Sequence, residues 1–230
     1  MRYHRQELVI GKKAQNKLRN ASVCIVGAGA LGSISAELLA RAGVGKLRII
    51  DKDVVELSNL QRQSMYTEDD IGQFKADAAK NHLLQINSDV SVGKKVVELN
   101  HKNVNLIKAD VVLDCTDNLE TKFLINDYCI KNKIPLVHGS AVKTAGFVFV
   151  INDGACLRCF LDKKQPYGTC ADVGVLNVLT HMIASMQATQ ALKLIIGEKY
   201  EKNLIRIDPW NSRFEIIKVK KNSKCPMHRK

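Results

Sequence analysis

The chain has 230 residues, of which 46% are hydrophobic and 25% are charged, as in an ordinary soluble protein that folds as one domain. No apolar run approaches the roughly 18 to 20 residues that cross a bilayer, and the first residues lack the apolar core of a signal peptide, so we expect a cytoplasmic protein that does not enter a membrane. The net charge of +12 is compatible with nucleic-acid binding, but aromatic residues make up only 5% and do not interleave with a basic stripe, so we expect an acidic protein partner or simple solvation instead.

A short amphipathic helix is predicted for residues 3 to 20, because apolar side chains recur at Leu8, Val9, Ala14 and Leu18. Arg5 falls within this helix. Taken by itself, an arginine at such a position is a surface charge.

The segment from Ser22 predicts a nucleotide site, because a buried strand (SVCIVG) runs into a glycine turn (GAGALG) and then into a helix (SISAELLARAG). Gly27 can take the positive φ of a tight turn, Gly29 lets backbone N–H groups approach a phosphate, and Gly32 lets the helix sit close on the strand. A phosphate would lie at the positive end of that helix. The next strand, KLRII, ends at Asp51, whose carboxylate is placed to accept hydrogen bonds from a ribose. Taken alone, this fingerprint would indicate a dinucleotide oxidoreductase.

The residues after this second strand favour a triphosphate over a dinucleotide. The runs DVVELSNLQRQ and EDDIGQFKA place five polar side chains in a loop and a helix start beside the glycine turn: Asp53, Asn59, Arg62, Gln63 and Lys75. Arg and Lys can neutralise charge on phosphoryl oxygens as it shifts during transfer, whereas hydride transfer needs no such pair of cations. The alternative, that Arg62 and Lys75 are ordinary solvated charges, stays open on the sequence alone.

A second polar group follows a later strand and closes the same predicted crevice. The run ADVVLDCTDN is a buried strand that ends in polar residues, as parallel strands do where they face a ligand. Asp117 lies there, where its carboxylate could hold Mg²⁺ between ATP phosphates or could cap the following helix. Both are possible if Asn118, which we also expect to contact the nucleotide, is the cap. Asp114 could support the metal from behind.

The remaining pattern predicts an α/β fold of the Rossmann type. A helix (ADAAKNHLLQIN), a third strand (VSVGKKVVEL) and a short helix (VNLIKA) come first; IPLVHG then predicts a fifth parallel strand, and AGFVFVIND a strand that turns back. A long helix runs from Gly174 to Gly197, and LIRIDPW with RFEIIKV forms a closing hairpin-like pair. We therefore predict a doubly wound, mostly parallel sheet with an added antiparallel C-terminal part. The methionines and His181 of the long helix suit core or dimer packing better than metal binding.

Cysteines in the second half indicate a metal centre. Cys156 and Cys159 have the C-x-x-C spacing that supplies two thiolates to one metal from a tight turn, although such a pair could also be redox-active. The tail offers Cys225 and His228 at the same spacing, and three cysteines with one histidine can bind zinc tetrahedrally. We expect a structural zinc ion that pins the tail to the C-x-x-C turn. Cys170 differs, because it lies in a polar segment just before the long helix, whose N-terminus could lower the pKa of its thiol.

The chain carries in order the motifs RYHRQ, GAGALG, AGVGKLRIIDKD, LSNLQRQ, DIGQFKA, DCTDN, CLRC and GTCADVGVL. In this combination it resembles the ThiF/MoeB/HesA family of sulfur-carrier adenylyltransferases, which are bacterial relatives of the ubiquitin-activating enzymes. The resemblance runs from Arg2 to about His228. The chain departs from the family at its end, where the closing motif is usually C-x-x-C and this chain has His228.

The resemblance implies a single ATP-binding domain over residues 1–230 with a tail held by zinc. It also implies that this domain uses Mg·ATP to adenylate the C-terminal Gly-Gly carboxylate of a ubiquitin-like sulfur carrier protein and releases pyrophosphate. It implies a homodimer in which Arg5 acts in trans on the ATP of the neighbouring subunit, like an arginine finger. It also implies a persulfide or acyl-disulfide role for Cys170 in the ThiF branch and a dispensable residue there in the MoeB branch. YTEDDIG and GSAV lie slightly nearer ThiF, so we expect a ThiS-like carrier and thiamine biosynthesis before a MoaD-like carrier and molybdopterin biosynthesis.

Three other interpretations stay open. A relative could activate another carboxylate, such as a peptide C-terminus, or act on tRNA, although the tRNA-acting dehydratases are not expected to carry the zinc pair. A nucleotide-binding relative without turnover would bind ATP but show no carrier-dependent exchange. An NAD-dependent oxidoreductase would quench nicotinamide fluorescence on titration.

Overall fold

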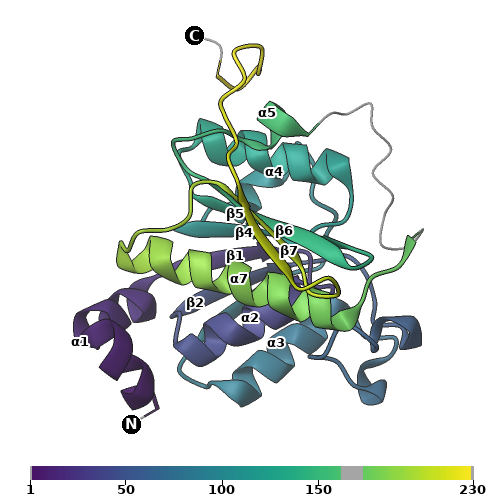
Figure 1. The fold of residues 1–230 in the computed structure, drawn as a ribbon. Coiled ribbons are helices and arrows are strands. Elements are labelled where there is room, and N and C mark those ends of the chain that lie inside the picture. The colour runs from purple at the N-terminus through teal and green to yellow at the C-terminus, as the bar shows by residue number, and fades with distance from the viewer. Residues whose placement is uncertain (1, 162–172, 229–230) are drawn as a thin grey trace.

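A mixed β-sheet runs through the centre of the protein and separates its helices into two layers (Figure 1). The computed structural model describes residues 2–161 and 173–228. Within these residues the sheet has eight strands in the order β3-β2-β1-β4-β5-β6-β7-β8. Their bounds are β1 (Ser22–Val26), β2 (Lys46–Ile50), β3 (Ser91–Lys95), β4 (Val111–Asp114), β5 (Leu136–Val142), β6 (Ala145–Ile151), β7 (Leu204–Asp208) and β8 (Arg213–Ile217).

The first five strands are parallel, and the last three continue the sheet in antiparallel fashion. The strand order runs outward from β1 in both directions, to β2 and β3 on one side and to β4 and β5 on the other. Such a reversal opens a crevice at the carboxyl ends of the two central strands, β1 and β4. The predicted doubly wound, mostly parallel sheet with an antiparallel C-terminal part is confirmed.

Helices cover both faces of the sheet, so the central strands are apolar on both sides. One face carries α2 (Gly32–Ala42), α3 (Lys75–Ile86) and α7 (Asn177–Ile196), with α1 (His4–Asn20) packed on α7. The other face carries α4 (Leu119–Lys131), α5 (Leu157–Phe160) and the turn η3 (Val104–Ile107). Two further turns, η1 (Leu57–Asn59) and η2 (Glu68–Asp70), lie between β2 and α3. Among the described helices, none has both the length and the apolar character that crossing a membrane requires.

Three elements differ from their prediction. The first helix is kinked, because Gly11 has a φ of 81°, outside the helical range. β3 stops at Lys95 rather than continuing through VVEL, because its partner strand β2 ends at the paired residue Ile50. The long helix starts at Asn177, and its Met182 is 44% exposed, so this methionine is not part of the core of the described chain.

Candidate active site and metal centre

A cavity of about 720 Å³ lies at the carboxyl ends of β1, β2 and β4 and continues along β5 and β6. Its size is that of a small-molecule site. Its wall contains residues from the glycine turn, from the loop after β2, from the end of β4 and from the start of α4. The residues expected from the sequence that line it are Gly27, Gly29, Asp51, Asp53, Asn59, Arg62, Gln63, Lys75, Asp117 and Asn118.

The glycine turn has no room for side chains at two of its three glycines. Gly27 has a φ of +89°, and a Cβ there would lie 2.8 Å from the carbonyl oxygen of Cys115. A Cβ on Gly32 would lie 1.8 Å from the carbonyl oxygen of Gly27, because α2 starts directly against the strand. Gly29 is different, since the nearest atom to a Cβ there is Gln63 Nε2 at 3.7 Å. Gly29 therefore leaves its backbone open to the cavity, as a phosphate cradle requires.

Asp51 ties the glycine turn to the loop after β2. Its Oδ2 accepts a hydrogen bond from Ala28 N at 2.6 Å, and its Oδ1 accepts one from Asp53 N at 2.8 Å. Burial raises the pKa of Asp51, while these two backbone N–H groups and the nearby Lys75 oppose the rise. Each carboxylate oxygen keeps a second lone pair, so Asp51 can hold the turn and still accept a hydrogen bond from a ribose hydroxyl.

Four cationic side chains line the cavity: Lys52, Arg62, Lys75 and Lys122. Lys52 Nζ lies 3.4 Å from Asp53 Oδ1. Arg62 donates one N–H to the carbonyl oxygen of Ser58 at 3.0 Å. Lys75, the first residue of α3, is buried, and its Nζ lies 3.6 Å from Asp53 Oδ2. Lys122, in the first turns of α4, is also buried and donates to the carbonyl oxygen of Thr116. The wall also contains the carboxylates of Asp51, Asp53, Glu98 and Asp117, so it offers as many anionic as cationic groups. Cations bind phosphoryl oxygens and a carboxylate binds a metal ion, so this mixture suits a phosphate ligand that carries a metal ion.

Asn118, not Asp117, caps α4. Asn118 Oδ1 accepts a hydrogen bond from Thr121 N at 2.8 Å, which is the usual bond of an N-cap residue. Asp117 was expected either to bind Mg²⁺ or to cap this helix, and the cap is Asn118. Asp117 is exposed in the cavity wall, where its carboxylate is available to a cation. Asp114 lies behind it, fully buried, and its Oδ1 accepts from Thr116 N at 3.0 Å and from Thr116 Oγ1 at 2.7 Å.

Two of the cavity's buried side chains have a polar atom without a hydrogen-bond partner among the described residues. These atoms are Gln63 Oε1 and His138 Nε2. A buried polar atom of this kind normally finds its partner in a water molecule or a ligand. Asn59 is also buried in the wall and stabilises its own loop, where its Oδ1 accepts from Glu56 N at 3.4 Å.

The donor set of the cavity fits Mg·ATP. The open backbone at Gly29 and the cations of Arg62, Lys75 and Lys122 would hold phosphoryl oxygens, and Asp117 offers the oxygen ligand that Mg²⁺ prefers. Nothing in this set requires a nicotinamide ring.

A second cluster, formed by α5 and the C-terminal tail, could hold a metal ion. The ligand atoms of Cys156, Cys159, Cys225 and His228 all lie within 4.8 Å of one another. Cys156 Sγ is 3.8 Å from Cys159 Sγ and 3.6 Å from Cys225 Sγ. Tetrahedral zinc with Zn–S bonds of about 2.3 Å would hold its sulfur ligands about 3.8 Å apart, so the spacing fits zinc.

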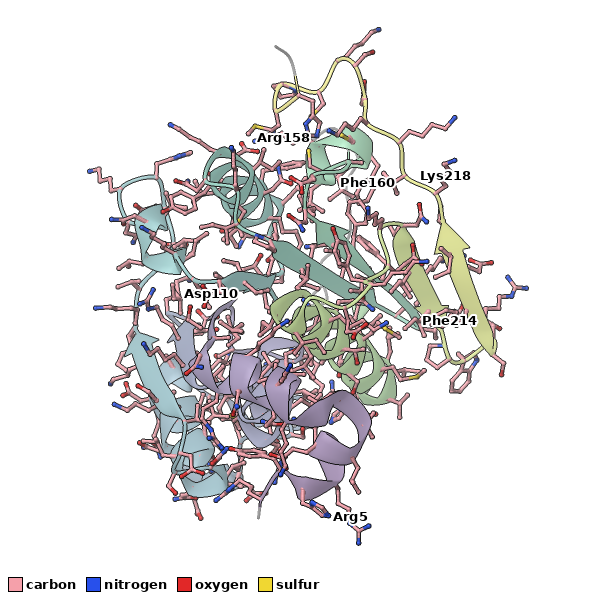
Figure 2. All side chains as sticks on the ribbon, turned by 90° about the vertical axis from the view of Figure 1, so that its left-hand side faces the viewer. Arg5, Asp110, Arg158, Phe160, Phe214 and Lys218 are labelled. Atoms are coloured by element: carbon pink, nitrogen blue, oxygen red, sulfur yellow. The ribbon has the colours of Figure 1, made fainter. Side chains whose placement is uncertain are left out.

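The protonation states of two members of this cluster, Cys159 and His228, suit a metal, whereas burial and the neighbouring cysteines raise the pKa of the Cys156 thiol and disfavour its thiolate as long as no cation is bound. Burial tends to raise the pKa of the Cys159 thiol, but backbone N–H groups of Asn222 and Cys156 lower it overall, which favours a thiolate. Burial lowers the pKa of His228, so its imidazole is neutral, and its Nε2 is buried with no partner in the described parts of the chain. A metal needs ligands in these forms. The tail passes over α5 at this point (Figures 1 and 2).

The protein-family model of the ThiF family matches residues 3–227 of this chain. The chain belongs to the ThiF family. The resemblance inferred from the motifs is therefore confirmed, and the family covers both the cavity and most of the cysteine cluster.

Several named relatives of this ThiF-family protein are adenylyltransferases. The sulfur carrier protein ThiS adenylyltransferase of Bacillus subtilis is 44% identical over 98% of this chain and 70% of its own length. The SAMP-activating enzyme E1 of Haloferax volcanii is 39% identical over 98% of this chain and 87% of its own. The adenylyltransferase and sulfurtransferase MOCS3 of Culex quinquefasciatus is 40% identical over 97% of this chain, which spans 54% of that relative.

Among solved structures, Escherichia coli MccB superposes with a TM-score of 0.89, covering 99% of this chain and 74% of that chain at 24% identity. At this level of identity the likeness supports the fold alone. The ThiF-family sheet and its helical layers are thus seen in an independent structure.

Two residues expected to act in this ThiF-family protein are not in the cavity of the described chain. Arg5 lies on the outside of α1 with its side chain directed away from the molecule (Figure 2), and it is exposed. It does not line the cavity, so any contact with ATP would require a second subunit. Cys170 lies outside the described residues.

Two cavity residues, Lys122 and His138, were not expected from the sequence. Lys122 follows the Asn118 cap by one helical turn, and this spacing could have indicated that it faces the same strand ends. His138 gave no local signal, because its position at the cavity depends on the pairing of β5 with β4.

Proposed function

We propose that this protein uses ATP to adenylate the C-terminal Gly-Gly carboxylate of a ubiquitin-like sulfur carrier protein and releases pyrophosphate. The observation that supports this most is the cavity itself, in which a glycine turn, the cations Arg62, Lys75 and Lys122, and the exposed carboxylate of Asp117 converge. The activities in the relatives' names point the same way. A ThiS-like carrier is favoured over a MoaD-like one, since the 44% identical Bacillus relative is named for ThiS.

The reaction needs no side-chain base, because a carboxylate is already a nucleophile at neutral pH. Catalysis then consists of positioning and charge neutralisation. Gly29 and the start of α2 hold phosphate through backbone N–H groups, and Asp51 accepts from the ribose. Arg62, Lys75 and Lys122 neutralise the phosphoryl oxygens. Asn59, Gln63 and Asn118 also line the cavity and would orient these oxygens. Mg²⁺ bound at Asp117 would neutralise charge on the oxygens of the departing pyrophosphate.

We further propose that the active form is a homodimer and that Arg5 reaches the cavity of the partner. Two observations support this. Arg5 is exposed, and the apolar side chains of Leu8 and Val9 beside it on α1 are 68% and 84% exposed. A surface of this kind is suited to protein contact. Cross-linking and sedimentation would test the oligomer, and mixing Arg5→Ala with Lys75→Met subunits should partly restore activity if Arg5 acts in trans.

Zinc in the cysteine cluster would be structural. It would hold the tail on α5, whose cysteines are not part of the cavity wall, and such a closed site contributes on the order of 10 kcal/mol to the local fold. A covalent sulfur role for Cys170 stays part of the proposal and is tested by intact mass spectrometry for a carrier linked to this thiol.

Carrier-dependent ATP–pyrophosphate exchange tests the proposed function. Loss of one transition-state donor commonly costs about 3 to 4 kcal/mol, so Arg62→Ala should lower exchange by a hundredfold or more. Arg41→Ala is the matched control, because Arg41 pairs with Glu37 on the surface of α2 and is not part of the cavity wall. Exchange in Arg62→Ala that stays near the wild-type rate would refute the assignment. ATP binding without exchange would instead indicate a relative that has lost turnover or acts on another carboxylate.

A further inference from the structure

A buried His–Asp pair forms part of the cavity wall next to the proposed nucleotide site. His138 on β5 is fully buried, and its Nδ1 lies 2.7 Å from Oδ2 of Asp114. The two residues are direct partners in the β4–β5 register. On the other side, the His138 ring packs against Phe147 of β6 at 5.3 Å between ring centroids.

The pair leaves one polar atom of the imidazole unused. Burial favours a neutral carboxyl, but Lys122 and His138 together lower the pKa of Asp114 to about 2, so Asp114 is ionised and His138 Nδ1 must donate the proton between them. Burial lowers the pKa of His138 despite Asp114 beside it, so the ring is neutral and its Nε2 is a pure acceptor. Nε2 is buried and has no hydrogen-bond partner in the described chain. A buried acceptor without a partner is costly, so a donor is expected to occupy this position in the working enzyme.

The sheet register fixes where this acceptor lies relative to the nucleotide. Ile50, Val26, Asp114 and His138 form one row across β2, β1, β4 and β5. The member of this row on β1 is Val26, which directly precedes Gly27 of the glycine turn. His138 therefore lies at the same height along the sheet as the phosphate cradle. Neighbouring strands are about 4.8 Å apart, which puts β5 about 10 Å to the side of β1. An extended peptide advances about 3.3 Å per residue, so about three residues span this distance.

The wall around His138 fits a peptide better than a phosphate. Here β5 and β6 contribute Ser140, Ala145 and Phe147, and the segment after α5 contributes Leu161. Apart from Lys122, the cations of the cavity, Lys52, Arg62 and Lys75, come from the segment after β2 and the start of α3. A tail that ends in glycines has no side-chain donors, so an acceptor in the wall such as His138 Nε2 can hold it only through a backbone N–H.

We propose that His138, held in place by Asp114, is a positioning residue whose Nε2 accepts a hydrogen bond from a backbone N–H within the last three residues of the carrier before its adenylation. The bond aims the terminal carboxylate at the α-phosphorus of the nucleotide. This inference rests on the proposed function and names one contact of its protein substrate.

Steady-state exchange kinetics with purified ThiS-type and MoaD-type carriers test the proposed hydrogen bond between His138 and the carrier. His138→Asn keeps an amide N–H near the position of Nδ1 for Asp114 but removes the acceptor at Nε2. We expect the carrier KM to rise about tenfold, while the ATP KM and the melting temperature stay close to wild type. His138→Gln places an amide oxygen near the position of Nε2 and should recover part of the loss. His82→Asn is the control, because His82 also pairs with an aspartate, Asp70 at 2.8 Å, but lies outside the cavity wall.

A double-mutant cycle identifies the donor directly. Three semisynthetic carriers would each replace one of the last three backbone N–H groups with an ester oxygen. We expect one ester to raise the carrier KM of the wild-type enzyme about tenfold and to have no further effect in His138→Asn. Equal losses in both enzymes, or an unchanged carrier KM in His138→Asn, would overturn the inference and leave adenylation intact. No exchange by the wild-type enzyme with either carrier would overturn the proposed function and this inference together.

Discussion

Lys122→Met is expected to make the stability of the protein less dependent on pH in the acid range. The methionine keeps the length of the side chain but removes the charge that, with His138, holds the buried Asp114 ionised. The pKa of Asp114 falls from its ordinary 3.8 to about 2 in the folded chain, which corresponds to about 2 kcal/mol at about 1.4 kcal/mol per pH unit. Lys122 is the largest of the favourable contributions. The variant should therefore lose up to about 2 kcal/mol at neutral pH.

The sign of the pH dependence separates this charge effect from lost packing. Because the folded-state pKa of Asp114 is depressed, its stabilisation is fully present above 3.8 and is lost as the pH falls towards 2. The difference in unfolding free energy between wild type and Lys122→Met should be constant from about pH 7 to 5 and fall to about half by pH 3. Urea unfolding followed by circular dichroism at several pH values measures this difference in unfolding free energy. Lys131→Met is the control, because Lys131 is an exposed lysine of the same helix. A difference that stays the same at pH 3 as at pH 7 would refute this reasoning.

Three further predictions concern the phosphate site and the metal centre. Lys75→Met should slow carrier-dependent exchange about a hundredfold with little change in melting temperature, because within the described residues the only ion pair of Lys75 is with the half-exposed Asp53. An unchanged exchange rate would contradict its role. Gly32→Ala should fail to fold, because its Cβ would lie 1.8 Å from a carbonyl oxygen. Gly29→Ala should fold, because a Cβ there meets no atom closer than 3.7 Å, but it should bind ATP more weakly in equilibrium dialysis. Cys225→Ala should abolish bound zinc measured by mass spectrometry and expose the tail to protease while exchange continues, and retained zinc would argue against this cluster.

The cavity could be predicted from the sequence where its residues lie close together in the chain. The glycine turn, the loop that carries Arg62 and Lys75, and the DCTDN end of β4 each belong to one short segment, so local patterns were enough to place them. The parallel strands could also be predicted, because residues such as Ile25 and Leu113 lie in continuous apolar runs that match burial on both faces.

The residues that could not be predicted depend on pairing between distant segments. His138 lies in the cavity wall because β5 pairs with β4 in the register that places it beside Asp114, and no local pattern specifies that register. The end of β3 depends in the same way on where β2 stops. The cysteine cluster was predicted although it joins segments far apart, because metal ligands follow a spacing rule that the tail repeats.

Formation of a carrier-AMP conjugate tests the proposed chemistry most directly. The protein would be incubated with ATP, Mg²⁺ and a ThiS-type or MoaD-type carrier, and the intact carrier would then be weighed by mass spectrometry. We expect one AMP on the carrier with the wild-type protein and none with Arg62→Ala. Bound ATP with an unmodified carrier of both types, and no pyrophosphate released, would contradict adenylation.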